Sequence, residues 1–382
     1  MKFFITVCLL SLRFISYAQS TSDFINQTSL DSLVKTVREF SGEDNCNVGG
    51  NSVQILNRVS DSGNDLAADY LFERLNNIGL QVSSDTYSTK GRNIIAKHIG
   101  SLYPDSMVMI CAHYDAVANY CADDNASGVG IVLEAARVLS NYQFKKTIVF
   151  ALWDEEESGL LGAKSYAASA NTNNDIYVSI LNIDMAGYDA NNDGVFDIDL
   201  NSSLGSENMK DLLVSINAAN NLNISPAIVQ PGTPDSDHSA FWTYQYPAVL
   251  LGESWSTSDQ NPKYHSSQDR ISLFNLPYYH EVAKLAVGFI GESAVPLKSV
   301  SAGNLLKEEL LAFINPHTNE LIVEVSENSV LKLIDLNGRE VISKVILRGK
   351  SVISLLKIPQ GIYLAKTYSV VLLGVSELKL FK

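Results

Sequence analysis

The sequence predicts an α/β domain with a mostly parallel central sheet sandwiched by helices, followed by a small all-β sandwich domain. Three observations support this prediction. Between about residues 25 and 293, apolar runs typical of strands alternate with apolar residues at helical spacing. The strand-like runs are continuously apolar, as expected for parallel strands that are buried on both faces. From about Leu306 onward, the pattern changes to short alternating β-runs separated by turn signals.

The α/β part can be followed one element at a time. In residues 65–79, apolar side chains recur every three or four positions from Leu66 to Ile78, and Gly79 supplies a helix C-terminus. The same reasoning predicts helices over residues 29–40, 65–79, 128–140, 159–170 and 206–221, and strands over residues 92–100, 106–112, 147–153, 177–183 and 247–253.

The first residues have the features of a secretory signal peptide. Lys2 precedes an apolar run, and Ser16 and Ala18 are small residues before a cleavage point between Ala18 and Gln19. Arg13 interrupts the run, which is too short to span a membrane, and no later stretch reaches spanning length. Four segments are therefore predicted: a signal peptide (1–18), the α/β domain (19–293), a linker (294–305) and the β-domain (306–382).

Net charge and cysteine content narrow the class of protein. A formal net charge of -14 argues against nucleic acid and anionic membrane surfaces as partners. Once the signal peptide is removed, Cys46, Cys111 and Cys121 remain, so at most one disulfide can form. Cys111 lies in a predicted core strand, which leaves Cys46 and Cys121 as the pair that could be joined.

The predicted strand over residues 147–153 ends in four successive carboxylates, Asp154 to Glu157. Adjacent like charges repel, and desolvating an unpaired carboxylate costs several kcal/mol, so structure alone gains little from this cluster. We therefore expect the glutamates to face a cation.

Other metal-binding residue types also follow predicted strands. The carboxyl ends of parallel strands meet at one edge of a sheet, where the functional crevice of α/β proteins lies. Imidazole and carboxylate ligands without cysteine suit zinc or a similar divalent ion. There are more carboxylates than one tetrahedral ion needs as ligands, so two ions that share a carboxylate are expected. The residues that follow strands or precede the helix at 128–140 are His113, Asp115, Asp123, Asp124, Asp184 and His265.

Six segments resemble, in order, the motif series of the zinc aminopeptidases of the M28 peptidase family. They are "AHYD", "ADDNASG", "EESGLLGA", "NIDMAGY", "SDHSAFW" and "NPKYHSSQD", and the resemblance covers roughly residues 30 to 293. It implies an exported enzyme with two zinc ions that hydrolyses N-terminal residues from peptides with a free N-terminus. Metal-activated water would attack the peptide bond, assisted by a glutamate general base.

The resemblance also implies a role for each matching residue. Glu156 would be the general base, and Asp115 would hold the tautomer of the neighbouring imidazole. Asp237 matches the pattern, but the match does not fix its role. The implied ligands are His113 and Asp184 for one ion, Glu157 and His265 for the other, and Asp123 as the bridge between them.

Two other functions remain open at this stage. A glutaminyl cyclase is an acyltransferase that shares the fold and much of the metal set, but it would work with one zinc ion. A non-catalytic module could hold structural metal in the same acidic cluster. The presence of both Glu156 and Glu157 disfavours that module. A structural metal ion needs a glutamate that binds it, but it does not need a second glutamate that could act as a base.

The C-terminal segment resembles the sorting domain of proteins exported by the type IX secretion system. "INPHTNELIVEV", "LKLIDLNGREV", "IPQGIYLAK" and the final "LKLFK" carry this resemblance. It implies that the protein passes through the periplasm, that it is secreted or held at the cell surface, and that the secretion machinery is its partner. An ordinary β-sandwich for carbohydrate binding or self-association is the alternative.

The segment from Asp189 to Asp199 contains a partial calcium-loop pattern. Leu200 stands where the twelfth position of such a loop carries a bidentate glutamate. A hairpin turn built on Asn192-Asp193-Gly194 is the competing interpretation, and we favour it. The calcium ligands of the first interpretation would be Asp189, Asn191, Asp193 and Asp197.

Overall fold

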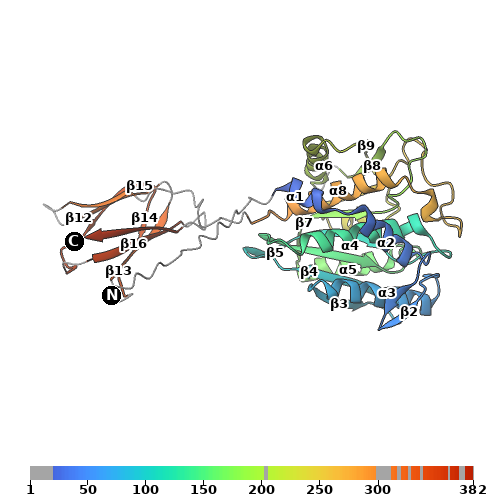
Figure 1. Ribbon diagram of the computed structural model, residues 1–382, viewed down its shortest axis with the longest axis horizontal. Helices are drawn as coiled ribbons and strands as arrows, with labels where there is room; N and C mark the ends of the chain where they lie inside the picture. The colour runs from blue at the N-terminus through green and yellow to red at the C-terminus, as the bar shows by residue number, and fades with distance from the viewer. Residues whose placement is uncertain are drawn as a thin grey trace, which may run out of the picture. The chain divides into compact units, whose positions relative to one another are not determined.

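The computed structural model divides the chain into two compact units, one comprising residues 19–297 and one within residues 298–382 (Figure 1). The predicted signal peptide and residues 298–305 of the predicted linker lie outside the described residues. The structure describes residues 20–201, 205–297, 311–315, 320–325, 328–335, 339–359, 362–369 and 375–381.

An eight-stranded sheet forms the centre of the first unit. The strands run in the order β3 (Gln81–Thr86), β4 (Arg92–His98), β6 (Lys146–Trp153), β5 (Tyr103–His113), β7 (Ile176–Ile183), β10 (Ala248–Glu253), β8 (Val195–Leu200) and β9 (Ser225–Val229). The four central strands β6, β5, β7 and β10 are parallel. β4 and β8 lie antiparallel beside them. The predicted α/β class is confirmed, with a mixed sheet whose centre is parallel.

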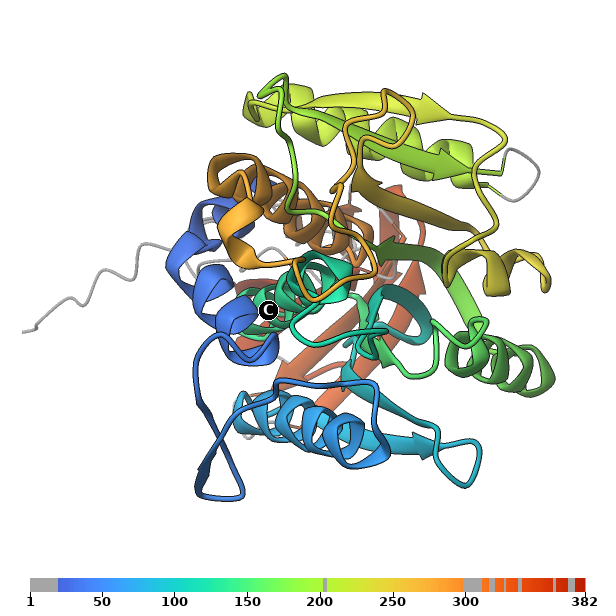
Figure 2. The same cartoon turned by 90° about the vertical axis from the view of Figure 1, so that its right-hand side faces the viewer.

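Helices cover both faces of this sheet. One face packs against α1 (Thr21–Gln27), α2 (Leu30–Phe40), α3 (Asp61–Asn77), α4 (Gly128–Leu139), α6 (Ser206–Asn220) and α8 (Leu276–Ser293). The other face packs against α5 (Leu161–Asn173) and α7 (His238–Trp242). Figure 2 shows the blue N-terminal helices and the green α5 on opposite sides of the sheet.

Side chains of the central strand β5 alternate between the two cores. Val108 and Ile110 point into the larger core, whereas Met109 and Cys111 point into the smaller one. All four are fully buried, which explains the continuous apolar run in the sequence. Cys46, Cys111 and Cys121 are all free, so the structure contains no Cys46–Cys121 disulfide among its described residues.

The predicted hairpin after β7 is absent from the described structure. A short antiparallel pair, β1 (Cys46–Val48) and β2 (Asn51–Val53), lies elsewhere in the unit. β8 pairs with β10 and β9, so the turn at Asn192 and Gly194 connects β7 to a strand that is not its neighbour. Both turn residues have positive φ, which is the local feature that suggested a hairpin.

The C-terminal unit consists of strands alone within its described residues. Its two antiparallel sheets share a core that includes Leu321 and Val323 from one sheet and Leu331 and Leu333 from the other. This confirms the predicted small β-domain. The sheets are β11 (Leu311–Asn315), β12 (Glu320–Val325) and β15 (Gly349–Ser354), and β14 (Glu340–Ile346), β13 (Ser329–Asp335), β16 (Ile362–Ser369) and β17 (Val375–Phe381).

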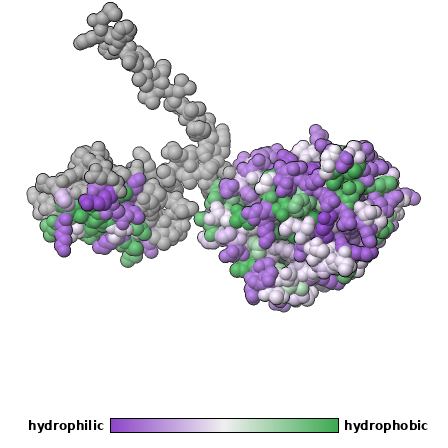
Figure 3. Space-filling model, turned by 90° about the horizontal axis from the view of Figure 1, so that it is seen from below, coloured by the Kyte–Doolittle hydropathy of each residue, from purple (hydrophilic) through white to green (hydrophobic). Residues whose placement is uncertain are grey.

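Polar and apolar residues are interspersed over the face seen in Figure 3. Within the part of the chain that the structure describes, every helix is too short or too polar to cross a bilayer.

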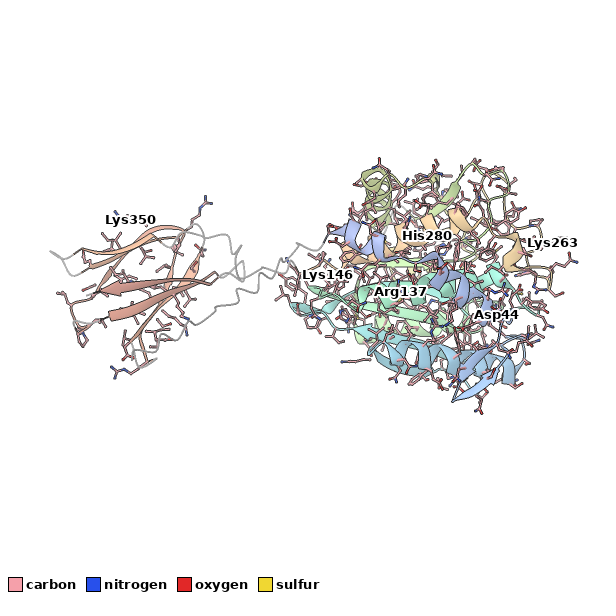
Figure 4. The ribbon with its side chains drawn as sticks, in the orientation of Figure 1. Asp44, Arg137, Lys146, Lys263, His280 and Lys350 are labelled. Atoms are coloured by element: carbon pink, nitrogen blue, oxygen red, sulfur yellow. The ribbon has the colours of Figure 1, made fainter. Side chains whose placement is uncertain are left out.

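The last residues of the first unit pack back onto its sheet. The backbone N–H groups of Lys145 and Lys146 donate to Val295 and Ala294, and Leu297 donates to Gln143. Lys146, labelled in Figure 4, also donates its ammonium to the carbonyl of Ser293. The compact unit therefore extends to residue 297.

These contacts generate a prediction about truncation. A chain of residues 19–297 should unfold in one cooperative transition with a Tm within about 2 °C of that unit in the full chain. Ending the chain at Ser293 removes three backbone hydrogen bonds, at about 0.5–1.5 kcal/mol each, and should lower Tm by several degrees. Calorimetry measures both. Equal Tm values would show that residues 294–297 do not stabilise the unit, and failure of 19–297 to fold would contradict the division into two units.

Candidate metal centre

Side chains of metal-ligand type lie at the carboxyl ends of the parallel strands, at one edge of the sheet. His113 is the last residue of β5, Glu156 and Glu157 follow β6, and Asp184 follows β7. Asp124 joins them from the turn Ala122–Ser127 that precedes α4. His265 reaches the same place from the loop after β10. Among the described residues, three groups have ligand atoms within 4.8 Å of one another: His113, Asp124 and Asp184; His113, Glu156 and Glu157; and Asp124, Glu157 and His265.

Asp124 lies between the two histidines. Its Oδ1 is 3.2 Å from Nε2 of His113, and its Oδ2 is 3.4 Å from Nε2 of His265. Each imidazole has a second carboxylate nearby. Nε2 of His113 is 3.4 Å from Oδ1 of Asp184, and Nε2 of His265 is 3.0 Å from Oε2 of Glu157. The arrangement is two half-sites that share one carboxylate.

The shared carboxylate belongs to Asp124, and not to Asp123 as we expected from the sequence. Asp123 points away from the histidines, where its carboxylate accepts hydrogen bonds from Gly187 N (2.8 Å) and Asn261 Nδ2 (3.2 Å). The backbone N–H groups of Asp123 and Asp124 both donate to the carboxylate of Asp269. With the backbone fixed in this way, the two adjacent side chains project in different directions.

Only two of the four carboxylates after β6 belong to the cluster. Asp154 accepts hydrogen bonds from the backbone of Arg92 and from the amide of Asn64. Glu155 accepts one from the hydroxyl of Tyr87. The expectation that the glutamates face a cation is therefore restricted to the last two of the run.

Asp115 holds both the imidazole and the glutamates in place. Its Oδ1 is 3.3 Å from Nδ1 of His113, which favours the tautomer that leaves Nε2 free for a metal. The same carboxylate accepts the backbone N–H groups of Glu156 (3.1 Å) and Glu157 (3.2 Å). One aspartate thus connects the end of β5 to the loop after β6.

The cluster carries more negative charge than its own side chains can balance. Burial is the main reason that the pKa of Glu156 rises to about 10 and that of Glu157 to about 8. Burial alone would lower the pKa of His113, but the neighbouring Glu156 and Asp184 raise it well above its usual value. For Asp184, burial acts to raise the pKa, and the contact with His113 outweighs it, so the pKa is lowered.

Buried oxygen atoms without partners show that the ligand set fits divalent cations. Oδ2 of Asp124 and Oε1 of Glu157 are buried and accept no hydrogen bond from any described residue. A buried carboxylate oxygen without a donor is unfavourable unless a cation satisfies it. The donors are imidazole nitrogens and carboxylate oxygens, the ligand types that zinc takes.

Asp237 lies beside this cluster but outside the three groups. It is fully buried at the start of α7, and neither of its oxygens has a hydrogen-bond partner among the described residues. Burial raises its pKa well above the usual value, and the charge of His113 opposes that shift.

The sequence analysis assigns no role to two residues that position the cluster, Arg58 and Asp269, although Asp269 ends the segment "NPKYHSSQD". The Arg58 side chain, 1% exposed, donates to the backbone carbonyls of Phe40, Tyr114, Tyr120 and Cys121. It thereby ties the turn before Asp124 to the segment after His113. Neither residue belongs to a periodic run, and an isolated arginine or aspartate in a loop is usually exposed.

The residues of the predicted calcium loop have other partners. The Asp197 carboxylate, in β8, accepts hydrogen bonds from Ser254 and Ser256. Asn191 and Asp193 bond to each other, and Asp189 accepts from Asn275. Within the described chain, none of these residues belongs to a metal-type group. Asp197 lies in β8, and calcium binding by this segment stays a prediction.

A cavity of about 600 Å³ opens over the cluster. Asp124 and the two histidines line one end of it, together with Glu156, Glu157 and Asp184. Trp255 and Tyr264 also line it, with ring centroids 5.4 Å apart, and both are more than 40% exposed. The cavity can therefore admit a substrate to the ligand-type side chains.

Comparison with protein families decides the class of this site. The family described as Peptidase family M28 matches residues 93–290, just over half of the chain. The chain belongs to peptidase family M28. The predicted family and the prediction of an enzyme are thus confirmed. A second family, the secretion system C-terminal sorting domain, matches residues 312–371, so this peptidase carries a domain that serves export.

Similar proteins agree with this assignment. A probable leucine aminopeptidase of Trichophyton verrucosum is 25% identical over 300 residues, covering 73% of this chain and 77% of the relative. Leucine aminopeptidase 1 of Trichophyton rubrum is 29% identical over 238 residues, covering 57% of this chain and 62% of the relative.

Two solved structures share the fold. The LapA aminopeptidase of Legionella pneumophila has a TM-score of 0.61 at 23% identity, covering 76% of this chain and 79% of that one. The glutaminyl cyclase of Porphyromonas gingivalis has a TM-score of 0.56 at 17% identity, covering 70% and 99%. At such low identity, the likeness establishes the fold of the M28 unit and leaves the reaction to be argued from the site.

The buried Arg58 generates a stability prediction. In Arg58→Lys, one ammonium with three N–H donors cannot serve all four carbonyls, so at least one buried acceptor loses its donor. We expect a loss of about 2–4 kcal/mol and a Tm lower by several degrees. Arg38→Lys is the matched control, because Arg38 pairs with Asp44 (labelled in Figure 4) at the surface, where such pairs contribute about 0–1 kcal/mol. Denaturant melts that gave both variants the same small loss would contradict this role of Arg58.

Proposed function

We propose that this protein is an exported aminopeptidase that uses two zinc ions to hydrolyse the N-terminal residue of peptides. The observation that carries the proposal is the position of Asp124, whose two carboxylate oxygens face different histidines. A carboxylate shared between two ions is typical of two-metal hydrolytic sites.

The residues divide into two ligand sets under this proposal. His113 and Asp184 would hold one zinc ion, Glu157 and His265 would hold the other, and Asp124 would be the ligand common to both. Bound zinc would lower the pKa of a water molecule to about 7 and polarise the scissile carbonyl. Ser236 donates a hydrogen bond to Oδ2 of Asp184 at 2.6 Å, which leaves Oδ1 directed at the half-site of His113.

Glu156 is the general base in this proposal. Its Oε2 lies 4.0 Å from Nε2 of His113, at the rim of the half-site, and its backbone is fixed by Asp115. From that position the carboxylate takes a proton from the attacking water and passes it to the leaving amine.

Hydrolysis of a substrate panel tests the proposed reaction. The zinc-loaded full chain should release the chromophore from aminoacyl substrates with a free amine, and neither N-acetylated substrates nor chelator-treated enzyme should react. A glutaminyl substrate is included because the fold also occurs in a glutaminyl cyclase. Cyclisation of that substrate without hydrolysis of the others, with one zinc ion per chain, would replace this proposal by the cyclase alternative.

Export is the second part of the proposed function. The C-terminal sorting domain implies secretion, and we infer that the chain crosses the periplasm and engages type IX secretion machinery through this domain. Every proposed ligand lies before residue 266, so the peptidase unit should keep its activity when the sorting domain is removed, whereas export should stop.

The neighbouring aspartates provide a prediction about metal content. Asp124→Asn replaces the shared ligand by an amide, a poorer zinc ligand, and should reduce zinc from two ions per chain to one or none. Asp123→Asn is the matched control, because its carboxylate faces Gly187 and Asn261, and it should keep both ions. Elemental analysis after gel filtration measures the stoichiometry. The reverse pattern would restore the assignment that the sequence suggested.

The two adjacent glutamates provide a prediction that separates base from ligand. Glu156→Gln keeps the shape but removes the base, and should lower kcat by about 10²- to 10⁴-fold while both ions remain bound. Glu157→Gln should weaken metal binding itself. The measurements are kcat and zinc content for each variant. Near-normal turnover of Glu156→Gln, or equal loss of zinc from both variants, would show that the roles are assigned wrongly.

A further inference from the structure

The end of the cavity away from the proposed zinc ions is also acidic. Two divalent ions would balance the four carboxylates that face them, Asp124, Glu156, Glu157 and Asp184. Four further carboxylates line the same cavity, and among the described residues neither lysine nor arginine does. These further carboxylates are Asp197, Asp199, Asp235 and Glu253.

Strand register places Asp199 deeper in the cavity than the metal ligands. β8 lies beside β10, with Asp199 opposite Leu250 and Asp197 opposite Gly252. β10 in turn lies beside β7, which Asp184 follows. With strands about 4.8 Å apart, β8 is about 10 Å from β7, and Asp199 is about 7 Å further along its strand than Asp197. Gly252 has no side chain to block the space between them. The two offsets combine to about 12 Å between the strand backbones, which the Asp199 side chain and one long substrate side chain can fill together.

Asp199 differs from Asp197 because only one of its carboxylate oxygens accepts a hydrogen bond from a described residue. The three hydrogen bonds from Ser254 and Ser256 satisfy Asp197. Asp199 is 6% exposed, accepts one hydrogen bond from the backbone of Thr233, and has no other hydrogen-bond partner among the described residues. Burial raises its pKa to about 6, with Asp197 adding to the shift, so it is mostly ionised at neutral pH. An ionised, nearly buried carboxylate without a counter-charge is a recognition element for a cation.

The side chains beside Asp199 are apolar. Leu250 of β10 and Val229 of β9 are its neighbours across the two flanking strands, and both line the cavity. Asp199 therefore has an apolar side chain next to it on each neighbouring strand. This combination matches a side chain with an aliphatic stem and a cationic end, as in lysine and arginine. A leucine side chain would leave the carboxylate buried without a partner.

The substrate's own amine does not account for Asp199. In an aminopeptidase the α-amine belongs to the residue whose carbonyl is attacked and is two bonds from that carbonyl carbon, so it must sit beside the metal ions. The carboxylates nearest the ions are available to that amine. Asp199 lies at the far end, where only the side chain of the N-terminal residue can reach.

We propose that this cavity selects peptides whose N-terminal residue is lysine or arginine, and that Asp199 is the specificity-determining residue. The proposal rests on the proposed aminopeptidase function and adds its substrate class. It differs from the preference named for the fungal leucine aminopeptidases that the chain resembles.

Steady-state kinetics on four aminoacyl p-nitroanilides test the proposal. For the zinc-loaded full chain, kcat/KM for the lysyl and arginyl substrates should exceed that for the leucyl and norleucyl substrates by at least about tenfold. Norleucine has nearly the same stem as lysine without the charge, so this comparison isolates the ammonium. Asp199→Asn should lower kcat/KM for lysine and arginine by about 10- to 100-fold and change that for leucine by less than about threefold.

Two further variants make the test decisive. Asp211→Asn removes one negative charge from the exposed surface of α6 and should leave the lysine-to-leucine ratio unchanged. Asp199→Leu extends the apolar walls and should invert the lysine-to-leucine ratio. This variant takes the place of Asp199→Asn as the test if the asparagine variant folds poorly. Zinc content of each variant shows whether the metal centre is intact.

The outcomes separate this inference from the function on which it rests. Wild-type protein that cleaves the leucyl substrate best would overturn the preference and leave the aminopeptidase function standing. An equal loss on all substrates in Asp199→Asn would show that Asp199 only supports the fold. If no substrate with a free amine were cleaved at all, both the function and the preference would be wrong.

Discussion

The carboxylate of Asp269 fixes which of two adjacent aspartates faces the histidines. It accepts the backbone N–H groups of both Asp123 and Asp124, with distances of 3.0–3.1 Å. Once the backbone is held in this way, Asp124 projects between His113 and His265, and Asp123 projects to the backbone of Gly187. The proposed sharing of one ligand between two ions depends on this backbone geometry. Asn261 contributes from the other side, because its amide donates to both Asp123 and Asp269.

The charge of the centre explains why its surroundings are so heavily hydrogen-bonded. Most of the acidic side chains are buried, and burial raises the carboxyl pKa values of Glu156, Glu157 and Asp269. Without cations, some of these groups bind protons, and the arrangement is held by backbone donors and by Arg58. Metal binding would then contribute to the stability of the unit, since folded protein offers a site that the unfolded chain lacks.

The positions of residues that directly follow a single strand could be predicted from the sequence. His113 and Asp184 come directly after apolar runs, so the topology of a parallel sheet was sufficient to bring them together. It failed where a choice depends on side-chain direction. Asp123 and Asp124 are adjacent and chemically identical, and only the tertiary contact with Asp269 distinguishes them. Arg58 and Asp269 carry no periodic signal, and their burial follows from contacts with residues distant in sequence.

The acidic segment from Asp189 to Asp199, for which we favoured a hairpin, shows the same limit and also lines the cavity. Asp189 to Asp199 has calcium-loop spacing, but from Val195 the chain is a strand, so Asp197 and Asp199 point to one face of the sheet. That face of the sheet borders the cavity. The central parallel strands hold the candidate metal ligands, and the flanking strands β8 and β9 supply the walls beyond them. Substitutions on the flanking strands can therefore alter the pocket without touching a ligand. Asp199 stands on β8, whereas the candidate ligands follow the central strands or lie in loops, so under our proposal Asp199 can be changed without direct loss of a metal ligand.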